Sequence, residues 1–183
     1  MQWKKFMPSS KIFIDIGSFK GEEIKWALEH GYQVHAFEPN PRMRPFLEKY
    51  ENLAKINYAA AWNRTGMIKL FEKNVEWDSD MGLSVIGDKT NINKDSFIEV
   101  PCINIGKYLE GLGRDIDILK IDAEGAEYII IESILTHVNP SKIKRWLVED
   151  HGGLIFDWHD HKHKILDKLK KKEVIIEDWV GMT

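Results

Sequence analysis

Cysteine is almost absent from this chain of 183 residues, which contains only Cys102. A single cysteine excludes an intrachain disulfide and a zinc site built on several cysteines. Apolar runs are also short: none approaches the ~20 residues that a membrane-spanning helix needs, and residues 1–10 lack the apolar core of a signal peptide. These absences favour a cytoplasmic protein without a membrane span.

No charge of one sign dominates the sequence. It has 26 Lys and Arg against 29 Asp and Glu, which gives a formal net charge of -3. A nucleic-acid or anionic-membrane partner would call for a basic excess, so neither is expected. Hydrophobic residues make up 43% and charged residues 30%, as in ordinary globular proteins. The length suits one domain over residues 1–183.

Short β-branched runs alternate with helix-like segments in the first third of the chain. The runs at 11–16, 32–37 and 54–61 predict strands. The segments between them predict helices, because apolar residues recur there at helical spacing and Gly31 follows the first of them. This βαβαβ order is typical of half of a doubly wound sheet.

The middle of the chain breaks this alternation. Strand-like pieces at 67–72, 83–86 and 97–103 predict a short antiparallel insertion over about residues 64–103, with a mobile loop at 88–95. The alternation then resumes, with predicted strands at 117–121, 143–149 and 173–178 and predicted helices at 126–137 and 160–171. The predicted fold is therefore α/β, a Rossmann-like and mostly parallel sheet with helices on both faces.

The pattern Asp15-x-Gly17-x-x-x-Gly21 lies where a buried strand gives way to a helix. Glycine lets the backbone turn tightly and approach a ligand, and the N–H groups of a helix start suit a carboxylate or phosphate. Glu38 ends the next strand about 20 residues later, where a carboxylate accepts both hydroxyls of an adenosine ribose. The alternative is a plain glycine turn with a surface acid.

Two details favour S-adenosylmethionine over a dinucleotide at this turn. The dinucleotide signature G-x-G-x-x-G needs a second glycine, but Ser18 and Phe19 follow Gly17. Asp15 also precedes the turn, where it is placed to meet an ammonium group or its water shell. A nicotinamide-dependent oxidoreductase is the competing class of enzyme.

Four segments together resemble the FkbM family of methyltransferases. They are FIDIGSFKGEE (13–23), HAFEPNP (35–41), AAAWNRTGMIKLF (59–71) and ILKIDAEGAEYIII (118–131). The resemblance implies a class I methyltransferase fold and S-adenosylmethionine as the methyl donor. It also implies O-methylation of a hydroxyl on a sugar, glycan or other small molecule.

The resemblance also implies roles for individual residues. Asp15 and Gly17 would hold the methionine end of the cofactor and Glu38 its ribose, with the adenine near Ala60 and Ala61. The predicted cofactor-binding residues are Asp15, Gly17, Ser18, Gly21, Glu38, Pro39, Ala60, Ala61 and Asp122. The sequence departs from the class I pattern, which usually ends in a hairpin: one clear strand (173–178) is predicted after the last helix, so the final strand is either missing or shortened within 179–183.

A second group of polar residues follows two later strands of the predicted sheet. Because the carboxyl ends of parallel strands meet at one edge, we expect this group to rim one cleft with Gly17 and Glu38. Methyl transfer to a hydroxyl needs a proton acceptor, and His151 suits that role near neutral pH, with Glu149 or Glu124 to orient or replace it. The predicted catalytic residues are His151, Glu149, Asp122 and Glu124.

Each of these residues also has a plainer interpretation. His151 could be a loop histidine that only makes a hydrogen bond, and Asp122 could cap the helix that starts near Gly125. Asp122, Glu149 and Asp150 could supply oxygen ligands to Mg2+. A magnesium site is therefore an open alternative, although no ligand spacing supports it. A module that binds the cofactor without catalysis would keep the same pocket, and a homodimer is possible.

The histidines near the C-terminus suggest a metal site only at first sight. His159 and His163 would share a helix face, but they open a lysine-rich helix and no second ligand set is present. The lysines at 168–172 are typical of the wet face of an amphipathic helix. This region therefore predicts a solvated surface helix.

Overall fold

The computed structural model describes residues 11–74, 82–155 and 158–179. One group of strands comprises β1 (Ile12–Ile16), β2 (Gln33–Phe37), β3 (Lys55–Asn57), β7 (Ile116–Ile121), β8 (Ile143–Val148) and β9 (Ile176–Asp178). A second group comprises β4 (Ala60–Trp62), β5 (Gly66–Lys73) and β6 (Ile92–Asn104). The helices are α1 (Glu22–Glu29), α2 (Arg44–Leu47), α3 (Ile105–Leu112), α4 (Glu127–His137) and α5 (Trp158–Lys170).

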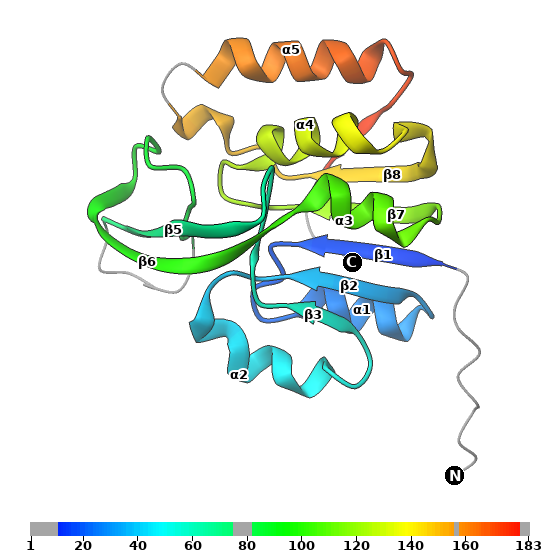
Figure 1. The fold of residues 1–183 in the computed structure, drawn as a ribbon, viewed down its shortest axis with the longest axis horizontal. Helices are drawn as coiled ribbons and strands as arrows, with labels where there is room; N and C mark the ends of the chain where they lie inside the picture. The colour runs from blue at the N-terminus through cyan, green and yellow to red at the C-terminus, as the bar shows by residue number, and fades with distance from the viewer. Residues whose placement is uncertain (1–10, 75–81, 156–157, 180–183) are drawn as a thin grey trace.

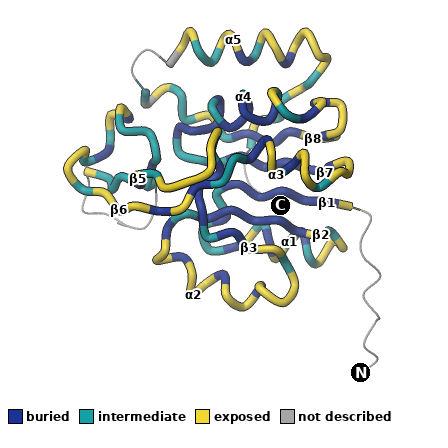
Figure 2. The backbone as a smooth tube through the Cα atoms, viewed as in Figure 1, coloured by how far each residue is buried: buried dark blue, intermediate teal, exposed yellow. Residues whose placement is uncertain are grey.

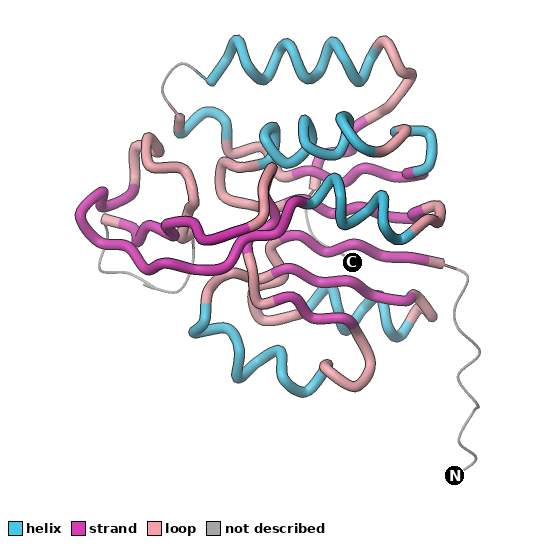
Figure 3. The backbone as a smooth tube through the Cα atoms, in the orientation of Figure 1, coloured by secondary structure: helices cyan, strands magenta, loops and turns pink. Residues whose placement is uncertain are grey.

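These strands form two sheets (Figure 1). The larger is six-stranded in the order β3-β2-β1-β7-β8-β9, and its described neighbours all pair in parallel. The smaller has the order β4-β6-β5. Figure 3 shows how helices and strands alternate through the larger sheet. The predicted α/β, Rossmann-like fold is confirmed.

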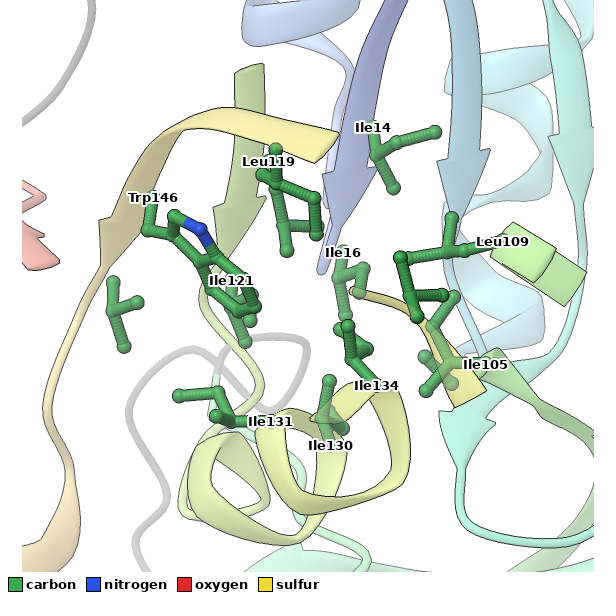
Figure 4. Close-up of a cluster of buried hydrophobic side chains, with 14 of the residues drawn as sticks. Ile14, Ile16, Ile105, Leu109, Leu119, Ile121, Ile130, Ile131, Ile134 and Trp146 are labelled. Atoms are coloured by element: carbon green, nitrogen blue, oxygen red, sulfur yellow. The ribbon is translucent and has the colours of Figure 1, made fainter. Parts of the chain in front are cut away.

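Helices cover both faces of the larger sheet, because the side chains of its central strands alternate between two apolar clusters. Ile14 and Ile16 of β1 pack with Leu109 of α3 and Ile134 of α4 (Figure 4). Phe13, which directly precedes Ile14, joins the cluster on the side of α1 and α2. The central strands are consequently buried along their length, whereas much of α2, α5 and the small sheet is exposed (Figure 2).

The prediction of one strand at 54–61 is wrong. The segment divides into β3, which pairs with β2, and β4, which pairs with β6 of the other sheet. The second sheet therefore begins before residue 64. Its β5–β6 pair is antiparallel as predicted, but β4 and β6 are parallel, so the sheet is mixed.

Two further expectations for the insertion need correction. No strand spans 83–86; Ser84 makes a single isolated bridge to Phe71. The predicted loop at 88–95 ends early, because β6 starts at Ile92. Ile92 is buried and pairs with Lys73, so this antiparallel pairing orders a segment that is polar in sequence.

The second half of the chain contains one unexpected helix and a short last strand. α3 was not predicted, although Asn104 caps it by accepting a hydrogen bond from the backbone N–H of Lys107. The strand expected at 173–178 covers only β9 and pairs in parallel with β8. Within the described residues β9 is the one strand that follows α5. Residues 180–183 lie outside the described part.

Candidate active site

A pocket lies at the carboxyl ends of β1, β2 and β7, which point toward the small sheet in Figure 1. Gly17, Glu38 and Asp122 directly follow these strands and line it. Ala60 of β4 and Leu70 of β5 line it from the small sheet. The pocket encloses about 820 Å³ of space between its lining atoms, part of it open to solvent.

The turn after β1 depends on Gly17. Its φ is +81°, and a Cβ there would lie 1.8 Å from the backbone carbonyl oxygen of Asp122. Only glycine therefore lets the loops after β1 and β7 touch. The Gly17 N–H donates to the carbonyl of Phe37 at 3.0 Å, and the Asp122 N–H donates to that of Ile16 at 3.0 Å. These bonds join three strand ends into one floor.

Glu38 presents a buried carboxylate to the pocket. Its Oε1 accepts the backbone N–H of Asn40 at 2.7 Å, and its Oε2 accepts that of Phe19 at 2.8 Å. Burial raises the pKa of Glu38 to about 7, against the lowering effect of these two bonds. Each oxygen keeps acceptor capacity, so the side chain is arranged to accept two neighbouring hydroxyls.

A buried ion pair lies beneath this floor. Asp15 and Lys120 are opposite each other in β1 and β7, and both are almost completely buried. The Lys120 Nζ lies 3.3 Å from Asp15 Oδ1 and 3.6 Å from Asp122 Oδ2, and it donates to the Gly17 carbonyl at 2.6 Å. Burial opposes its charge, but these carboxylates outweigh it and raise the pKa of Lys120. Lys120 thus connects the residues after both strands.

A cluster of carboxylates surrounds one imidazole beside the pocket. His151 Nε2 lies 3.5 Å from Glu149 Oε1 and 3.7 Å from Glu124 Oε2. One ligand atom each of Asp122, Glu149 and His151 lie within 4.8 Å of one another. The Nδ1 of the same ring makes a 3.0 Å hydrogen bond with Glu127 Oε1. The ring is therefore fixed on one side, and its Nε2 faces the strand-end carboxylates.

The charges of this cluster shift two pKa values. Burial lowers the pKa of His151, but the hydrogen bond with Glu127 and the nearby carboxylates outweigh it and raise the value to about 8. Burial also raises the pKa of Asp122 to about 6, with Lys120 opposing and Glu149 adding to the rise. At pH 7 most of the imidazole is consequently protonated and most of Asp122 is ionised.

Glu127, whose side chain is fully buried, holds the loop after β7, which carries Asp122 and Glu124. Its Oε1 accepts the backbone N–H groups of Ala123 at 3.1 Å and Gly125 at 2.9 Å. α4 has Ala126 as its N-cap and no side-chain cap. Helix capping therefore does not account for Asp122, the carboxylate of which faces Lys120 instead.

The model of the methyltransferase FkbM domain matches residues 15–173 of this chain. The chain belongs to the FkbM methyltransferase family. This confirms the resemblance seen in the sequence. Comparisons with curated proteins and with solved structures found no match. Among the described helices of this FkbM methyltransferase, none is both long and apolar enough to cross a membrane.

The predicted cofactor-binding residues of this FkbM methyltransferase fall into two groups. The pocket is lined by Gly17, Glu38, Pro39, Ala60, Ala61 and Asp122. Asp15, Ser18 and Gly21 do not line it. Ser18 is buried and donates from Oγ to the Asp15 carbonyl at 3.2 Å. A Cβ on Gly21 would lie 2.8 Å from the Tyr50 ring, so this glycine allows α1 to start close to the segment after α2.

The predicted catalytic residues also divide. Asp122 and Glu124 line the pocket, whereas Glu149 and His151 lie beside them in the cluster. Asp150 accepts the Gly152 N–H and pairs with Lys162, and His151 takes its place beside Asp122 and Glu149 in the cluster. The remaining set includes an imidazole, which Mg2+ does not prefer.

Sequence reasoning missed three charged residues of the site: Lys89, Lys120 and Glu127. Lys120 lies between the apolar residues Leu119 and Ile121 of a predicted strand, and Glu127 ends the segment KIDAEGAE, so both residues stand in the FkbM motif itself. Lys89 lies outside that motif, in a polar segment that is typical of a surface loop. Only the tertiary structure brings it to Glu124.

Proposed function

We propose that this FkbM-family protein transfers a methyl group from S-adenosylmethionine to a hydroxyl of a sugar, a glycan or another small molecule. The observation that carries the proposal is the Glu38 carboxylate, which is buried at the pocket wall with each oxygen already oriented by a backbone N–H. Two vicinal ribose hydroxyls match such an acceptor pair. The family match supports methyl transfer as the reaction.

The pocket has the features that an adenosine-type cofactor needs. Glu38 would hold the ribose, and the apolar wall at Ala60 and Ala61 would take the adenine. Gly17 and Asp122 would face the methionine end, where a side chain at position 17 would fill the space between them. When bound, S-adenosylmethionine supplies a methyl group that its sulfonium has already activated.

The transfer needs alignment and a proton acceptor. Asp122 and Glu124 border the pocket and orient the hydroxyl. The hydroxyl proton passes to Nε2 of His151, while Glu127 holds Nδ1. The ring must first be deprotonated, so the proposal places the active form above pH 8.

Calorimetry with S-adenosylhomocysteine and with NADH tests the choice of cofactor. We expect the homocysteine product to bind and NADH not to bind, because the pocket lacks the second glycine of the dinucleotide turn. Glu38→Gln should weaken the binding, whereas Glu48→Gln, a charge change at an exposed position, should not. Binding of NADH alone would refute the proposal in favour of an oxidoreductase.

A screen of hydroxyl compounds, read by the formation of S-adenosylhomocysteine, tests for catalysis. With the best acceptor, His151→Ala should lower the rate and leave the affinity for S-adenosylhomocysteine nearly unchanged, since His151 does not line the pocket. An equal rate in this variant would refute the role of His151 as the base. Tight binding without turnover on any compound would indicate a non-catalytic module. The homodimer and the cytoplasmic location stay predictions.

A further inference from the structure

Lys89 carries a charged side chain that is completely buried. Its Nζ forms an ion pair with the carboxylate of Glu124, and its side-chain exposure is 0%. Within the described residues no second acidic side chain forms an ion pair with Lys89. A buried ammonium without a partner is strongly unfavourable, so the position of this lysine depends on Glu124. The pair joins the insertion to the loop after β7.

The segment around Lys89 is fixed to both loops of the candidate site. Ser84 donates from Oγ to the backbone carbonyl of Glu124 at 2.7 Å. Lys89 itself makes an antiparallel bridge with Ile155, shortly after His151 in the chain. A Cβ on Gly125 would lie 2.8 Å from the Ile155 side chain, so the two loops are also packed against each other.

Glu124 lies between the pocket and the imidazole. It lines the pocket, and its Oε2, the oxygen that pairs with Lys89, is 3.7 Å from His151 Nε2. Its backbone has a φ of +53°, followed by +108° at Gly125. Left-handed backbone at a non-glycine residue persists only where the surroundings impose it. Here Lys89 and Ser84 hold the side chain and the carbonyl of the same residue.

We propose that Lys89 is a positioning residue for methyl transfer, because its buried ammonium fixes the Glu124 carboxylate between the pocket and the His151 imidazole. The inference rests on the proposed function. It assigns to a residue of the insertion a role in positioning Glu124, in addition to the part of the pocket wall that the insertion supplies. Lys89 acts through Glu124 and does not itself line the pocket.

Without the Lys89 ammonium, the negative charge of Glu124 would lie beside the imidazole with no cation paired to it. The charged groups around His151 come from several elements: Glu127 from α4, Asp122 and Glu124 from the loop after β7, Glu149 and Asp150 after β8, with Lys89, Lys120 and Lys162 as the nearby cations. Only Lys89 pairs with Glu124 among these cations. Its loss should therefore increase the proton affinity of His151 and reduce the fraction of deprotonated ring at pH 7.

The test compares Lys89→Met with Lys89→Arg, which keeps the charge. Lys94→Met is the matched control, because Lys94 lies on the same stretch of chain but is 65% exposed and pairs with Asp88 at the surface. The first readout is the NMR titration of the His151 ring, assigned by its loss in His151→Ala. This readout needs neither cofactor nor acceptor. The second is the pH profile of methyl transfer, with the affinity for S-adenosylhomocysteine measured alongside.

In Lys89→Met we expect the proton affinity of His151 to rise about three- to tenfold, and the rate at pH 7 to fall by a similar factor. The affinity for S-adenosylhomocysteine should stay within about twofold. Lys89→Arg and Lys94→Met should resemble the wild type. An unchanged His151 titration in a folded Lys89→Met protein would overturn the inference. So would an equal loss of cofactor affinity and rate, since that pattern indicates a merely structural role.

Glu124→Gln keeps the inference testable if Lys89→Met does not fold. Loss of the Glu124 charge should lower the proton affinity of His151, and an unchanged titration would again overturn the coupling. Failure of the proposed function is recognised separately. In that case the wild-type protein would neither bind S-adenosylhomocysteine nor transfer a methyl group, whatever the titration of His151 shows.

Discussion

Replacement of Glu38 by glutamine is expected to change stability and ligand affinity in opposite directions. Burial raises the pKa of Glu38 from 4.5 to about 7 in the folded protein. Between these values the folded protein keeps a proton that the unfolded chain has released, so stability falls as the pH rises through this window. The loss amounts to about 3 kcal/mol above pH 7. Glutamine has no charge to bury and avoids it.

The affinity for S-adenosylhomocysteine should change the other way. An amide has one acceptor oxygen, whereas Glu38 offers two, each already oriented by the N–H of Phe19 or Asn40. Loss of one hydrogen bond to a charged group weakens binding by about 1.5–3 kcal/mol, or roughly 10- to 150-fold. In the wild type the affinity should also fall below pH 7, because protonated Glu38 loses acceptor capacity.

Urea unfolding at pH 5 and pH 8, with calorimetry at both, measures the two effects. The stability of Glu38→Gln relative to the wild type should improve by roughly 2–3 kcal/mol from pH 5 to pH 8. Glu48→Gln, at an exposed position, serves as the control and should show no such change. A stability difference that is the same at both pH values would refute the argument from charge burial. Undiminished binding by the variant would refute the contact with the ribose.

Three further predictions concern the strand ends. Gly17→Ala should lower stability by about 2–4 kcal/mol in urea unfolding, because its Cβ would lie 1.8 Å from the Asp122 carbonyl at a φ of +81°; a neutral effect would contradict the close approach. Lys120→Met should cost about 3–5 kcal/mol at pH 8, since Asp15 loses its buried partner; a neutral effect would argue against the ion pair. The value of kcat/KM should rise with pH to a plateau above about 8, as expected for His151 as the base; a rise centred near 6 would instead identify Asp122.

The sequence predicts that the residues after β1 and β2 meet, because the signals for this arrangement are local. A buried strand, a glycine turn and a helix occupy adjacent residues, and Glu38 must follow the next strand of such a unit. The structure accordingly brings Gly17 and Glu38 to one pocket. Asp15 was placed at the ligand, but its side chain alternates to the face opposite Ile14 and Ile16, where Lys120 neutralises it.

The remainder depends on contacts between distant parts of the chain. Nothing in residues 54–61 shows that β3 and β4 belong to different sheets, because that division follows from pairing with β6, about 45 residues later. Lys89 and Glu124 are 35 residues apart and meet only in the folded chain. α3 differs, because Asn104 at its start and Gly113 at its end are residue types typical of helix caps. Local reasoning from the sequence could therefore have predicted this helix.

The two sheets also differ in how well the pocket residues that they supply tolerate substitution. The pocket floor comes from the larger sheet, whose glycine and carboxylate positions admit no substitute of another shape. Part of the opposite wall comes from the segment that contains Leu83 and Val85, which, among the described residues, is joined to β5 only through the isolated bridge between Ser84 and Phe71. In evolutionary terms, such a wall can drift toward new acceptors while the donor site is retained. We therefore expect an alignment of the family to vary most between residues 74 and 91, with Ser84 and Lys89 as exceptions.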